Sequence, residues 1–345
     1  MKKPAITLLA PGALTAFPSI DPSVLPHAPA LSRLLTRADP RPFPGIDPEA
    51  LLCEAFGVRA TADGDLPVAW FSWLSDFDTP PDTAVLRADP VHLRADASGL
   101  LLFGPGQLDI QPDEAAQLLA ALNGLYAERG WRFHSAQPQR WYLSLPDAPR
   151  IATRRPGGLL GQDISGRLPT GEEAGEWHTV LNEIQMLLHS HPVNERRQAE
   201  GRPAINSLWL WGGGRPAGQS TACPWTRVWS DHPLAMGLAR HAGCERSDVP
   251  DSFAGMDGPP PGTHLLVLDG LHPAAGAQDF DAWRQGVERL ESAWAGPLVD
   301  ALRRGRLASV SIAGGNGLLF HSTRRSLMRF WRRPTPFHTR LQHHP

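Results

Sequence analysis

Short apolar runs alternate with segments of helical periodicity along most of the chain. Each run is bounded by Gly, Pro or polar residues, as is typical of buried strands. The predicted strands are Ala5–Leu9, 66–74, Ser207–Trp211, 264–268 and 307–312. Apolar residues three or four positions apart predict helices at 31–35, 48–57, 170–188, 235–241 and 283–302, the last one bent at Pro297. This alternation predicts an α/β protein whose main sheet is mostly parallel and flanked by helices.

The pattern changes between 85 and 145, where it predicts a separate α+β unit. Residues 91–102 are expected to form a hairpin about Ser98-Gly99, Pro112 begins a strongly amphipathic helix, and Arg140–Leu145 returns as a strand. The sequence therefore predicts three parts. They are a discontinuous core of 1–84 and 160–320, an inserted domain of 85–159, and a basic C-terminal tail of 321–345.

Charge and composition exclude several classes of chemistry. The formal net charge of −2 favours neither nucleic acid nor acidic substrates as the main partner. Lys2 and Lys3 are the only lysines, so no interior lysine is available for a Schiff base or a phosphate-binding Walker loop. Cys53, Cys223 and Cys244 lack CxxC spacing, which argues against a zinc ribbon and a disulfide scaffold.

The first residues superficially resemble a signal peptide, because two lysines precede an apolar run. Pro4 and Pro11 interrupt that run, which is too short for a signal sequence. No stretch approaches the ~20 apolar residues that span a bilayer. These features predict a cytoplasmic protein without a membrane partner.

The most distinctive stretch is 191–214, HPVNERRQAEGRPAINSLWLWGGG. It joins a charged segment to the predicted strand Ser207–Trp211 and then to three glycines. Glycines directly after a strand allow a tight turn, and they can also direct backbone N–H groups toward an anion. A simple strand-to-loop turn is the more frequent structure for such a run.

Two segments of the chain carry motifs of a known enzyme family. GQDISGR at 161–167 resembles the family segment PHDxTGK, and the stretch 191–214 resembles HPxNxxRxxxGxxxxNxxWxWGxG. The chain thereby resembles the archaeal-type cofactor-independent phosphoglycerate mutases of the alkaline phosphatase superfamily, and more closely the RpfE-type regulatory proteins related to them. The resemblance runs nearly end to end. It implies an alkaline-phosphatase-like α/β core with an inserted substrate domain.

The same resemblance implies chemistry that this chain lacks the residues to perform. Enzymes of the family hold two divalent metals with Asp and His ligands and use a Ser nucleophile. Here Pro11 stands at the first ligand, Ile46 at the nucleophile, and the stretch from Ala313 to Asn316 where the family has an Asp-His pair. We therefore expect no catalytic residue. Asp269 and His272, whose spacing is one residue short, are weak metal candidates.

The substrate-side motifs, in contrast, are retained. Arginine can grip phosphate with two hydrogen bonds, and asparagine beside tryptophan can bind a carboxylate or phosphate in a dry site. The alternative is that these tryptophans belong to the core and the asparagine bonds to backbone. The predicted ligand-binding residues, for a phosphorylated or carboxylate small molecule, are Arg140, Asp163, Asn194, Arg197, Asn206, Trp209, Trp211, Gly212 and Gly214.

Other polar groupings favour less specific interpretations. His189 and His191 are best explained as a helix end, and Asp231-His232 as the start of a helix at Pro233. The segment 321–345 contains six arginines and no acid, with Phe330 and Trp331 among them, so it could contact nucleic acid or an acidic protein. Such tails are more often only solvated.

Three hypotheses follow. The first is a catalytically silent member of the phosphomutase-like fold with a regulatory or small-anion-binding role and no cofactor. The second is an active, metal-dependent mutase or phosphatase that binds Mn or Zn through rearranged ligands, including Asp47, Asp269 and His272. The third is an interaction protein that binds nucleic acid or a partner through 321–345.

Overall fold

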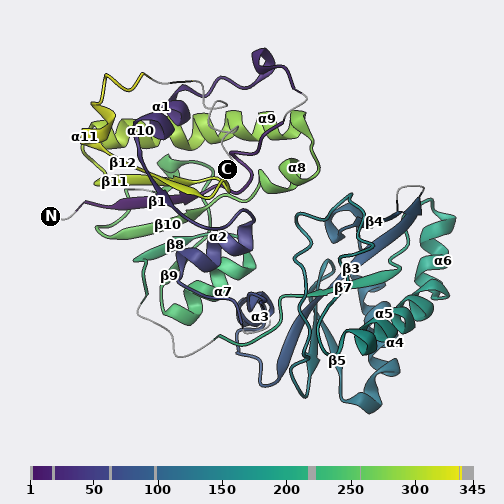
Figure 1. Ribbon diagram of the computed structural model, residues 1–345. Coiled ribbons are helices and arrows are strands. Elements are labelled where there is room, and N and C mark those ends of the chain that lie inside the picture. The colour runs from purple at the N-terminus through teal and green to yellow at the C-terminus, as the bar shows by residue number, and fades with distance from the viewer. Residues whose placement is uncertain are drawn as a thin grey trace. The chain divides into compact units, whose positions relative to one another are not determined.

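The computed structural model describes residues 3–17, 20–61, 64–96, 99–216, 223–256, 258–333 and Thr335 (Figure 1). The chain forms two compact units. Unit 1 comprises 1–57 and 220–345, and unit 2 comprises 58–219. The sequence instead predicted boundaries at 84/85 and 159/160. The observed unit 2 is larger because it also contains the segments on either side of the predicted insertion.

Unit 1 is built on a seven-stranded sheet of order β2-β12-β11-β1-β10-β8-β9. The five strands from β11 to β9 are parallel, and β12 and β2 add an antiparallel edge. This arrangement confirms the predicted mainly parallel sheet. The strands are β1 (Ala5–Leu9), β2 (Asp39–Pro42), β8 (Arg227–Trp229), β9 (Glu245–Ser247), β10 (Thr263–Val267), β11 (Ser309–Ala313) and β12 (Leu318–Thr323).

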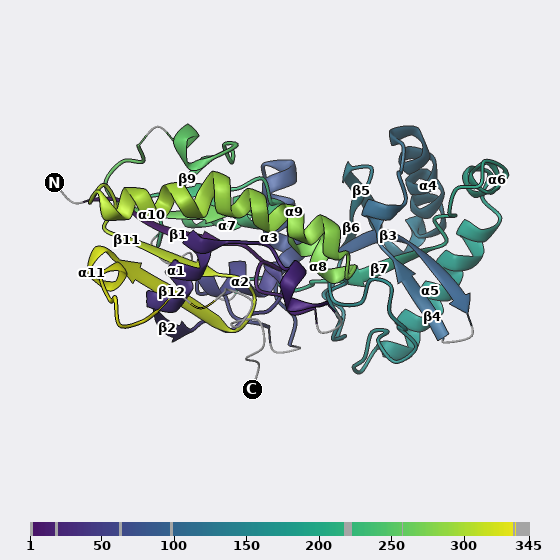
Figure 2. The same ribbon diagram turned by 90° about the horizontal axis from the view of Figure 1, so that it is seen from above.

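Helices cover both faces of this sheet (Figures 1 and 2). The helices α1, α9 and α10 lie on one face, and α2 and α7 lie on the other. The helical segments of unit 1 are η1 (Pro22–Val24), α1 (Pro29–Arg37), α2 (Pro48–Ala55), α7 (Pro233–Ala242), η4 (Phe253–Met256), α8 (His272–Gly276), α9 (Phe280–Arg289), η5 (Leu290–Ala295), α10 (Gly296–Arg303) and α11 (Arg324–Leu327).

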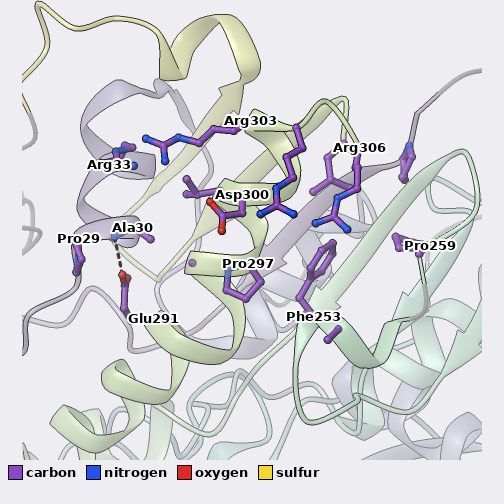
Figure 3. A pocket seen from close by; sticks show the side chains of 17 residues that line it. Pro29, Ala30, Arg33, Phe253, Pro259, Glu291, Pro297, Asp300, Arg303 and Arg306 are labelled. Carbon is purple, nitrogen blue, oxygen red and sulfur yellow. Dashed lines mark hydrogen bonds between the residues drawn. The ribbon is translucent and has the colours of Figure 1, made fainter.

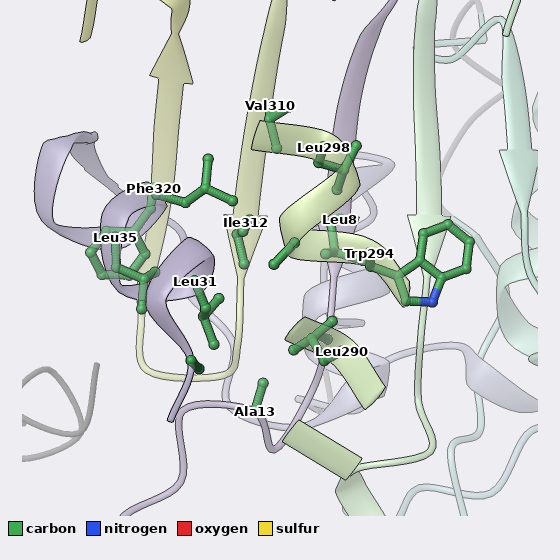
Figure 4. Packing of buried hydrophobic residues seen from close by; sticks show 14 of the residues in the cluster. Leu8, Ala13, Leu31, Leu35, Leu290, Trp294, Leu298, Val310, Ile312 and Phe320 are labelled. Atoms are coloured by element: carbon green, nitrogen blue, oxygen red, sulfur yellow. The ribbon is translucent and has the colours of Figure 1, made fainter. Parts of the chain in front are cut away.

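The main core of unit 1 lies between the sheet and the layer of α1, η5 and α10. Alternate strand residues such as Leu8 and Ile312 point into it, as the two-residue period of a strand requires. Leu31 of α1 and Leu298 of α10 meet them from the helical side (Figure 4). All four side chains are at most 1% exposed.

Unit 2 combines an antiparallel sheet with helices. Its strands run in the order β4-β3-β6-β5, and β7 pairs with β3. The strands are β3 (Ala84–Asp96), β4 (Gly99–Phe103), β5 (Arg132–Gln137), β6 (Arg140–Leu145) and β7 (Ser207–Trp211). The helices are α3 (Val68–Phe77), η2 (Pro105–Gln107), α4 (Pro112–Leu125), η3 (Ala127–Arg129), α5 (Ala174–His189) and α6 (Pro192–Ala199).

The sheet of unit 2 has two buried faces of different character. Leu208 and Leu210 of β7 join the apolar core formed with α4 and α5. Trp209 and Trp211 alternate with them and therefore point to the opposite face. There, Arg87 and Asp89 of β3 are also buried. The alternation thus separates an apolar face from one that carries charge.

The predicted strand at 66–74 is wrong. Residues 68–77 form α3, with Pro67 as N-cap and Asp78 closing the helix in a left-handed conformation. Val68, Phe71 and Leu74 are buried at helical spacing. The continuous apolar run concealed this period, because a helix buried on most of its surface cannot be told from a buried strand by hydrophobicity alone.

The structure contains the strands of the predicted hairpin at 91–102, but it differs from the predicted tail at 321–345. His92 pairs with Phe103 across the predicted hairpin, whereas Ser98 lies outside the described residues. The predicted tail begins instead as structure: His321 pairs with Asp39 in the sheet, and Arg329 forms a two-pronged ion pair with Asp39. The sequence-based boundary at 321 therefore cuts through β12. Residues 336–345 lie outside the described residues.

Cys223 and Cys244 form a disulfide, whereas the buried Cys53 is a thiol. The spacing of the two cysteines in the sequence does not predict this disulfide. They come together because each precedes one of the adjacent parallel strands β8 and β9, which α7 connects. Within the described ranges, no helix is both long and apolar enough to cross a membrane.

Candidate functional site

The first candidate site lies at the edge of the unit 1 sheet where β1, β10 and β11 end. These neighbouring strands are parallel, so the segments that follow them emerge together. The Ala10 N–H donates to the Ala313 carbonyl at 2.9 Å, and the Leu268 N–H donates to the Leu9 carbonyl at 2.8 Å. Pairing thus continues past the strand ends and joins the three loops. We call this region the carboxyl edge.

Close backbone approaches bring a fourth segment to the carboxyl edge. A Cβ on Gly12 would lie 2.9 Å from the Leu271 carbonyl oxygen, and one on Gly315 would lie 2.5 Å from the Ile46 carbonyl oxygen. Both glycines have positive φ, so their loops depend on the missing side chain. Trp283 fixes the first loop by donating from Nε1 to the Gly12 carbonyl at 2.8 Å. The loop containing Ile46 therefore meets the loops after β1 and β11.

The side chains at the carboxyl edge supply few metal ligands. Pro11 has no ligating atom, Ala313 is buried and apolar, and the Ile46 side chain is 68% exposed. Asn316 is buried, and its Oδ1 lacks a hydrogen-bond partner within the described structure. Asp47 caps α2 by accepting the Ala50 N–H at 2.8 Å.

Asp269 and His272 lie in the loop after β10, at this same edge. Burial lowers the pKa of His272, while the negative charges of Asp47 and Asp269 oppose that effect. The imidazole is therefore neutral near pH 7, the state in which histidine can bind a metal. In the parts of the chain that the structure describes, however, no group of three or more His, Cys, Asp or Glu side chains could hold a metal ion.

The predicted ligand-binding residues lie in unit 2, and their polar atoms contact protein groups. Arg140 donates through Nε and Nη2 to the carboxylate of Asp76, both at 2.7 Å. Tyr142 donates its hydroxyl to the same carboxylate at 2.5 Å. Burial, with the negative charge of Asp76, raises the pKa of Tyr142, so the phenol stays protonated and remains a donor.

Arg197 is completely buried in a second ion pair. Its Nη1 donates to Glu114 at 2.7 Å, and its other nitrogens donate to the carbonyls of Leu108 and Pro203. Burial lowers the pKa of Arg197, and Glu114 acts against that shift. Because guanidinium remains charged at any ordinary pH, this pair ties α6 to α4 through buried opposite charges.

The two asparagines of the motif bond to backbone. Asn194 donates to the carbonyls of Leu188 and Ile205 and accepts the Ile205 N–H. Asn206 accepts the Leu93 N–H at 2.7 Å and donates to the Leu93 carbonyl at 2.8 Å. The Asn206 side chain thus links segments that are distant in sequence, whereas Asn194 joins the end of α5 to the segment before β7. This matches the alternative interpretation of Asn206 as a backbone partner.

The motif tryptophans also have internal partners. Trp209 donates from Nε1 to the Arg154 carbonyl, and Trp211 donates from Nε1 to Asp89, both at 2.7 Å. The guanidinium of Arg87 lies 5.3 Å from the Trp211 ring centroid and forms an ion pair with Asp89. Burial acts to lower the pKa of Arg87, but Asp89, Tyr142 and Asp76 together outweigh it and the pKa is raised.

The glycine loop after β7 is shaped by close packing. Gly212 donates its N–H to Thr153 Oγ1 at 3.1 Å, and a Cβ there would lie 3.1 Å from Val68 Cβ. A Cβ on Gly214 would lie 2.4 Å from Thr61 Cγ2. The cavity beside Gly214 measures about 60 Å³ and the one beside Trp209 about 20 Å³. Sites for small organic ligands typically measure roughly 300–1,000 Å³.

Asp163 lies at the end of the β3–β4 hairpin. Its Oδ1 accepts N–H groups from Leu100 and Ser165, both at 3.0 Å. The Ser165 hydroxyl also donates to Oδ1. This hydrogen bond lowers the pKa of Asp163 most, and the two backbone hydrogen bonds lower it further. The nine predicted residues are thus brought into one unit but not around one cavity. Their partners Asp76, Asp89 and Glu114 were missed, because no local pattern signals a long-range ion pair.

The chain is similar to phosphoglycerate mutases at low identity. It is 28% identical over 196 residues to a probable 2,3-bisphosphoglycerate-independent phosphoglycerate mutase of Geobacter sulfurreducens, covering 55% of this chain and 49% of that protein. A mutase of the same name from Methanothrix thermoacetophila is 28% identical over 212 residues, covering 56% and 54%. The chain spans about half the length of these curated relatives.

A solved structure extends the likeness to the whole fold. The PH0037 protein from Pyrococcus horikoshii matches with a TM-score of 0.53 and 13% identity, covering 95% of this chain and 92% of that chain. At that identity the match supports the fold alone, a mixed α/β architecture with a large, mostly parallel sheet. No family model matches the chain.

Proposed function

We propose that this protein is a phosphoglycerate-mutase-like protein that does not transfer phosphoryl groups and acts as a regulatory protein, as in the RpfE-type group that its sequence resembles. The observation that carries the proposal is the composition of the carboxyl edge. Pro11 and Ile46 lie in two different loops that meet there, and Ala313 ends β11 at the same edge. The resemblance assigns metal-binding or nucleophilic roles to these three places.

The chemistry of the reaction explains why these residues matter. A two-metal site stabilises both the attacking and the leaving oxygen, and it needs several carboxylate or imidazole ligands. Proline, isoleucine and alanine side chains have neither a ligand atom nor an oxygen that could attack phosphorus. Asp269 and His272 alone would leave most coordination positions of even one metal to water.

The contacts within unit 2 argue against binding of a small anion by the arginines of the retained motif. A phosphorylated acid bound by Arg140 or Arg197 would have to replace Asp76 or Glu114, which already neutralise these guanidinium groups. Separating a buried pair leaves an uncompensated charge and costs about 3–5 kcal/mol. We therefore propose that the retained motif maintains the architecture of unit 2, and that regulation acts through a surface elsewhere.

Metal content and ligand stabilisation test this proposal together. The protein is incubated with Mn²⁺ or Zn²⁺ and dialysed, and bound metal is measured with and without Asp269→Asn. We expect less than stoichiometric metal. In a thermal-shift series, 2- and 3-phosphoglycerate should not raise the melting temperature of the wild type through Arg140. Any increase should therefore be the same in Arg140→Gln. An increase in the wild type that Arg140→Gln abolishes would support the small-anion role. Stoichiometric metal that is lost in Asp269→Asn would support a working metal centre.

An active enzyme with rearranged ligands is the second candidate. The observation that favours it is that Asp47, Asp269 and His272 lie in segments that meet at the carboxyl edge. Under this hypothesis, Mn or Zn binding should raise the melting temperature and phosphoglycerate turnover should depend on His272. A metal-dependent shift that survives His272→Gln would place the metal elsewhere and remove the support for this candidate.

A further inference from the structure

A large cavity lies at the opposite edge of the unit 1 sheet. Its wall includes Pro4, which directly precedes β1, and Leu307, which lies two residues before β11. Both positions are at the amino ends of parallel strands, away from the carboxyl edge. The cavity measures about 760 Å³, which is within the usual range for small organic ligands. Figure 3 shows its lining, and we call it the amino-edge cavity.

An irregular helix shapes one wall of the cavity. The helix from α9 to α10 contains the π-helical segment η5 directly before Gly296 and Pro297. Proline has no N–H to donate and its ring crowds the preceding turn, so a widened turn accommodates it. The sequence-predicted bend at Pro297 is thus a π-helical segment that ends one residue before Gly296. Insertions of this kind are frequent at functional sites.

The widened turn also places Glu291 against α1. Its carboxylate oxygens accept the N–H groups of Ala30 and Leu31 at 2.7 and 2.9 Å. Figure 3 shows the first of these bonds beside the cavity. The negative charge of Glu291 therefore caps the amino end of a helix, where it is favourable. It is already engaged by backbone donors at the cavity wall.

Four arginines line the cavity without protein partners. The side chains of Arg33, Arg303, Arg304 and Arg306 make no hydrogen bond or ion pair with any residue that the structure describes. Arg33 has a buried Nε with no partner among those residues. In contrast, arginines elsewhere in the chain, such as Arg329, form ion pairs with carboxylates.

The arginines also lie close enough to affect each other. Figure 3 shows Arg303 directed toward Arg33. Burial lowers the pKa of Arg33, and the positive charges of Arg303 and Arg37 lower it further. Asp300 and Glu291 act in the opposite direction. Positive charge thus exceeds negative charge at the cavity, and an anion bound there would relieve this repulsion.

The remaining lining is apolar. Phe253 and Pro297 present their rings to the cavity in Figure 3, and Val299, Leu307 and Pro259 add aliphatic surface. A site for inorganic phosphate alone would need neither this surface nor this volume. Guanidinium groups favour phosphate oxygens because they can donate two parallel hydrogen bonds, and they also stack on flat rings.

We propose that the amino-edge cavity binds an organic polyphosphate with a flat or apolar body, of the nucleoside di- or triphosphate class. The phosphates contact Arg33, Arg303 and Arg306, and the body lies against Phe253 and Pro297. The site lies at the other edge of the sheet from the carboxyl edge, so it is independent of the proposed loss of mutase chemistry. Its occupancy would give a regulatory protein a small-molecule input.

Isothermal titration of the full-length protein with ATP, inorganic tripolyphosphate and adenosine, in EDTA, tests the proposal. We expect saturable ATP binding, weaker tripolyphosphate binding and no measurable adenosine binding. The double variant Arg303→Glu, Arg306→Glu should weaken ATP binding by roughly 100-fold, because two charge-assisted hydrogen bonds contribute about 1.5 kcal/mol or more each and 1.4 kcal/mol is tenfold. Phe253→Leu should weaken ATP binding but not tripolyphosphate binding.

The matched control is Arg289→Glu, which reverses an exposed arginine of α9 that does not line the cavity. It should leave ATP binding within about twofold of the wild type, since charge effects at exposed sites are small. Circular dichroism of each variant checks folding. No saturable ATP binding at millimolar concentration would overturn the proposal. A loss of about tenfold in Arg289→Glu would also overturn it. That variant changes the net charge by half as much as the double variant, so half of the roughly 100-fold loss on a logarithmic scale would mean that binding follows net charge rather than the cavity.

Discussion

Individual side chains of the retained motif have structural partners that their sequence pattern does not reveal. Arg197 and Glu114 are 83 positions apart, yet they form one buried ion pair. Arg140 and Asp76 form another, 64 positions apart. An arginine in a family motif therefore indicates that a guanidinium is needed, but the sequence does not say whether its partner is a ligand or a carboxylate.

Replacing Arg197 tests this structural role. Arg197→Ala should lower the free energy of unfolding by about 3–5 kcal/mol, because it breaks a completely buried ion pair and leaves Glu114 with Arg202 as its remaining counter-charge. Arg196→Ala, the exposed neighbour, should change it by no more than about 0.5 kcal/mol. Urea unfolding followed by circular dichroism measures both. Equal effects of the two variants would contradict the role assigned to Arg197.

His134 should make stability depend on pH. Burial, with a smaller effect of Arg132, lowers the pKa of His134 to about 4, and its Nε2 lies 2.9 Å from Ser144 Oγ. The unfolded chain, with a histidine pKa near 6.5, binds a proton that the folded chain rejects between these values. Stability should therefore fall as pH decreases from about 6.5 to 4.

The His134→Gln variant isolates this contribution. Between pH 6.5 and 4, we expect the free energy of unfolding of the wild type to fall by about 1–2 kcal/mol more than that of the variant. This is less than the full pKa shift of His134 would give, because solvent partly screens the side chain. Urea unfolding at pH 7, 5.5 and 4.5 gives the comparison. Parallel pH profiles for the two proteins would show that His134 is not the group responsible.

At the scale of elements, short runs of apolar residues bounded by Gly, Pro or polar residues located two strands correctly. Ser207–Trp211 and Arg140–Leu145 coincide with the predicted strands. The helix α3 was missed because its apolar run hides the period. The pairing of β7 with β3 was also missed, because strand pairing depends on packing over more than 100 residues rather than on the strand's own residues.

The loops at the carboxyl edge should tolerate substitution poorly. Gly12 has φ of +82°, and backbone atoms lie within 3.0 Å of the place that a Cβ would occupy, so Gly12→Ala combines strain with a clash. We expect it to cost at least ~2 kcal/mol, from the left-handed penalty of about 1–2 kcal/mol plus displacement of the Leu271 loop. Thermal unfolding monitored by circular dichroism measures the loss.

Gly57→Ala is the control for backbone strain alone, since Gly57 has φ of +68° but no atom within 4 Å of its Cβ position. It should cost only about 1 kcal/mol. A Gly12→Ala variant as stable as Gly57→Ala would mean that the loops after β1 and β10 do not meet as described.

The C-terminal segment should divide into a structural and a dispensable part. Truncation after Arg333 keeps β12, α11 and the ion pair of Arg329 with Asp39, so the melting temperature should change little. Truncation after Phe320 removes half of β12 and should lower it by several degrees, as a loss of about 1–2 kcal/mol would. Equal melting temperatures would show that the sheet ends before 321.

At the scale of the molecule, the alternation of elements predicted the architecture, including the mainly parallel sheet and a separate α+β unit. It did not predict the domain boundaries, because unit 2 draws α3, α5, α6 and β7 from segments assigned to the core. The residues at the carboxyl edge, namely Pro11, Ile46, Asp269 and Ala313, could be identified from the motifs of the family that the sequence resembles. The amino-edge cavity could not, because the cluster Arg303, Arg304 and Arg306 matches no family motif and Arg33 joins it from a helix distant in sequence.

Phosphoryl transfer itself is the most direct test of the central claim, that the carboxyl edge lacks mutase chemistry. The purified full-length protein is incubated with 3-phosphoglycerate and Mn²⁺ or Zn²⁺, and phosphorus NMR follows 2-phosphoglycerate and inorganic phosphate over many hours. We predict that neither product rises above the level of a sample without protein. Formation of either product by the wild type, and its loss in an Asp269→Asn, His272→Gln variant that remains folded, would contradict the account.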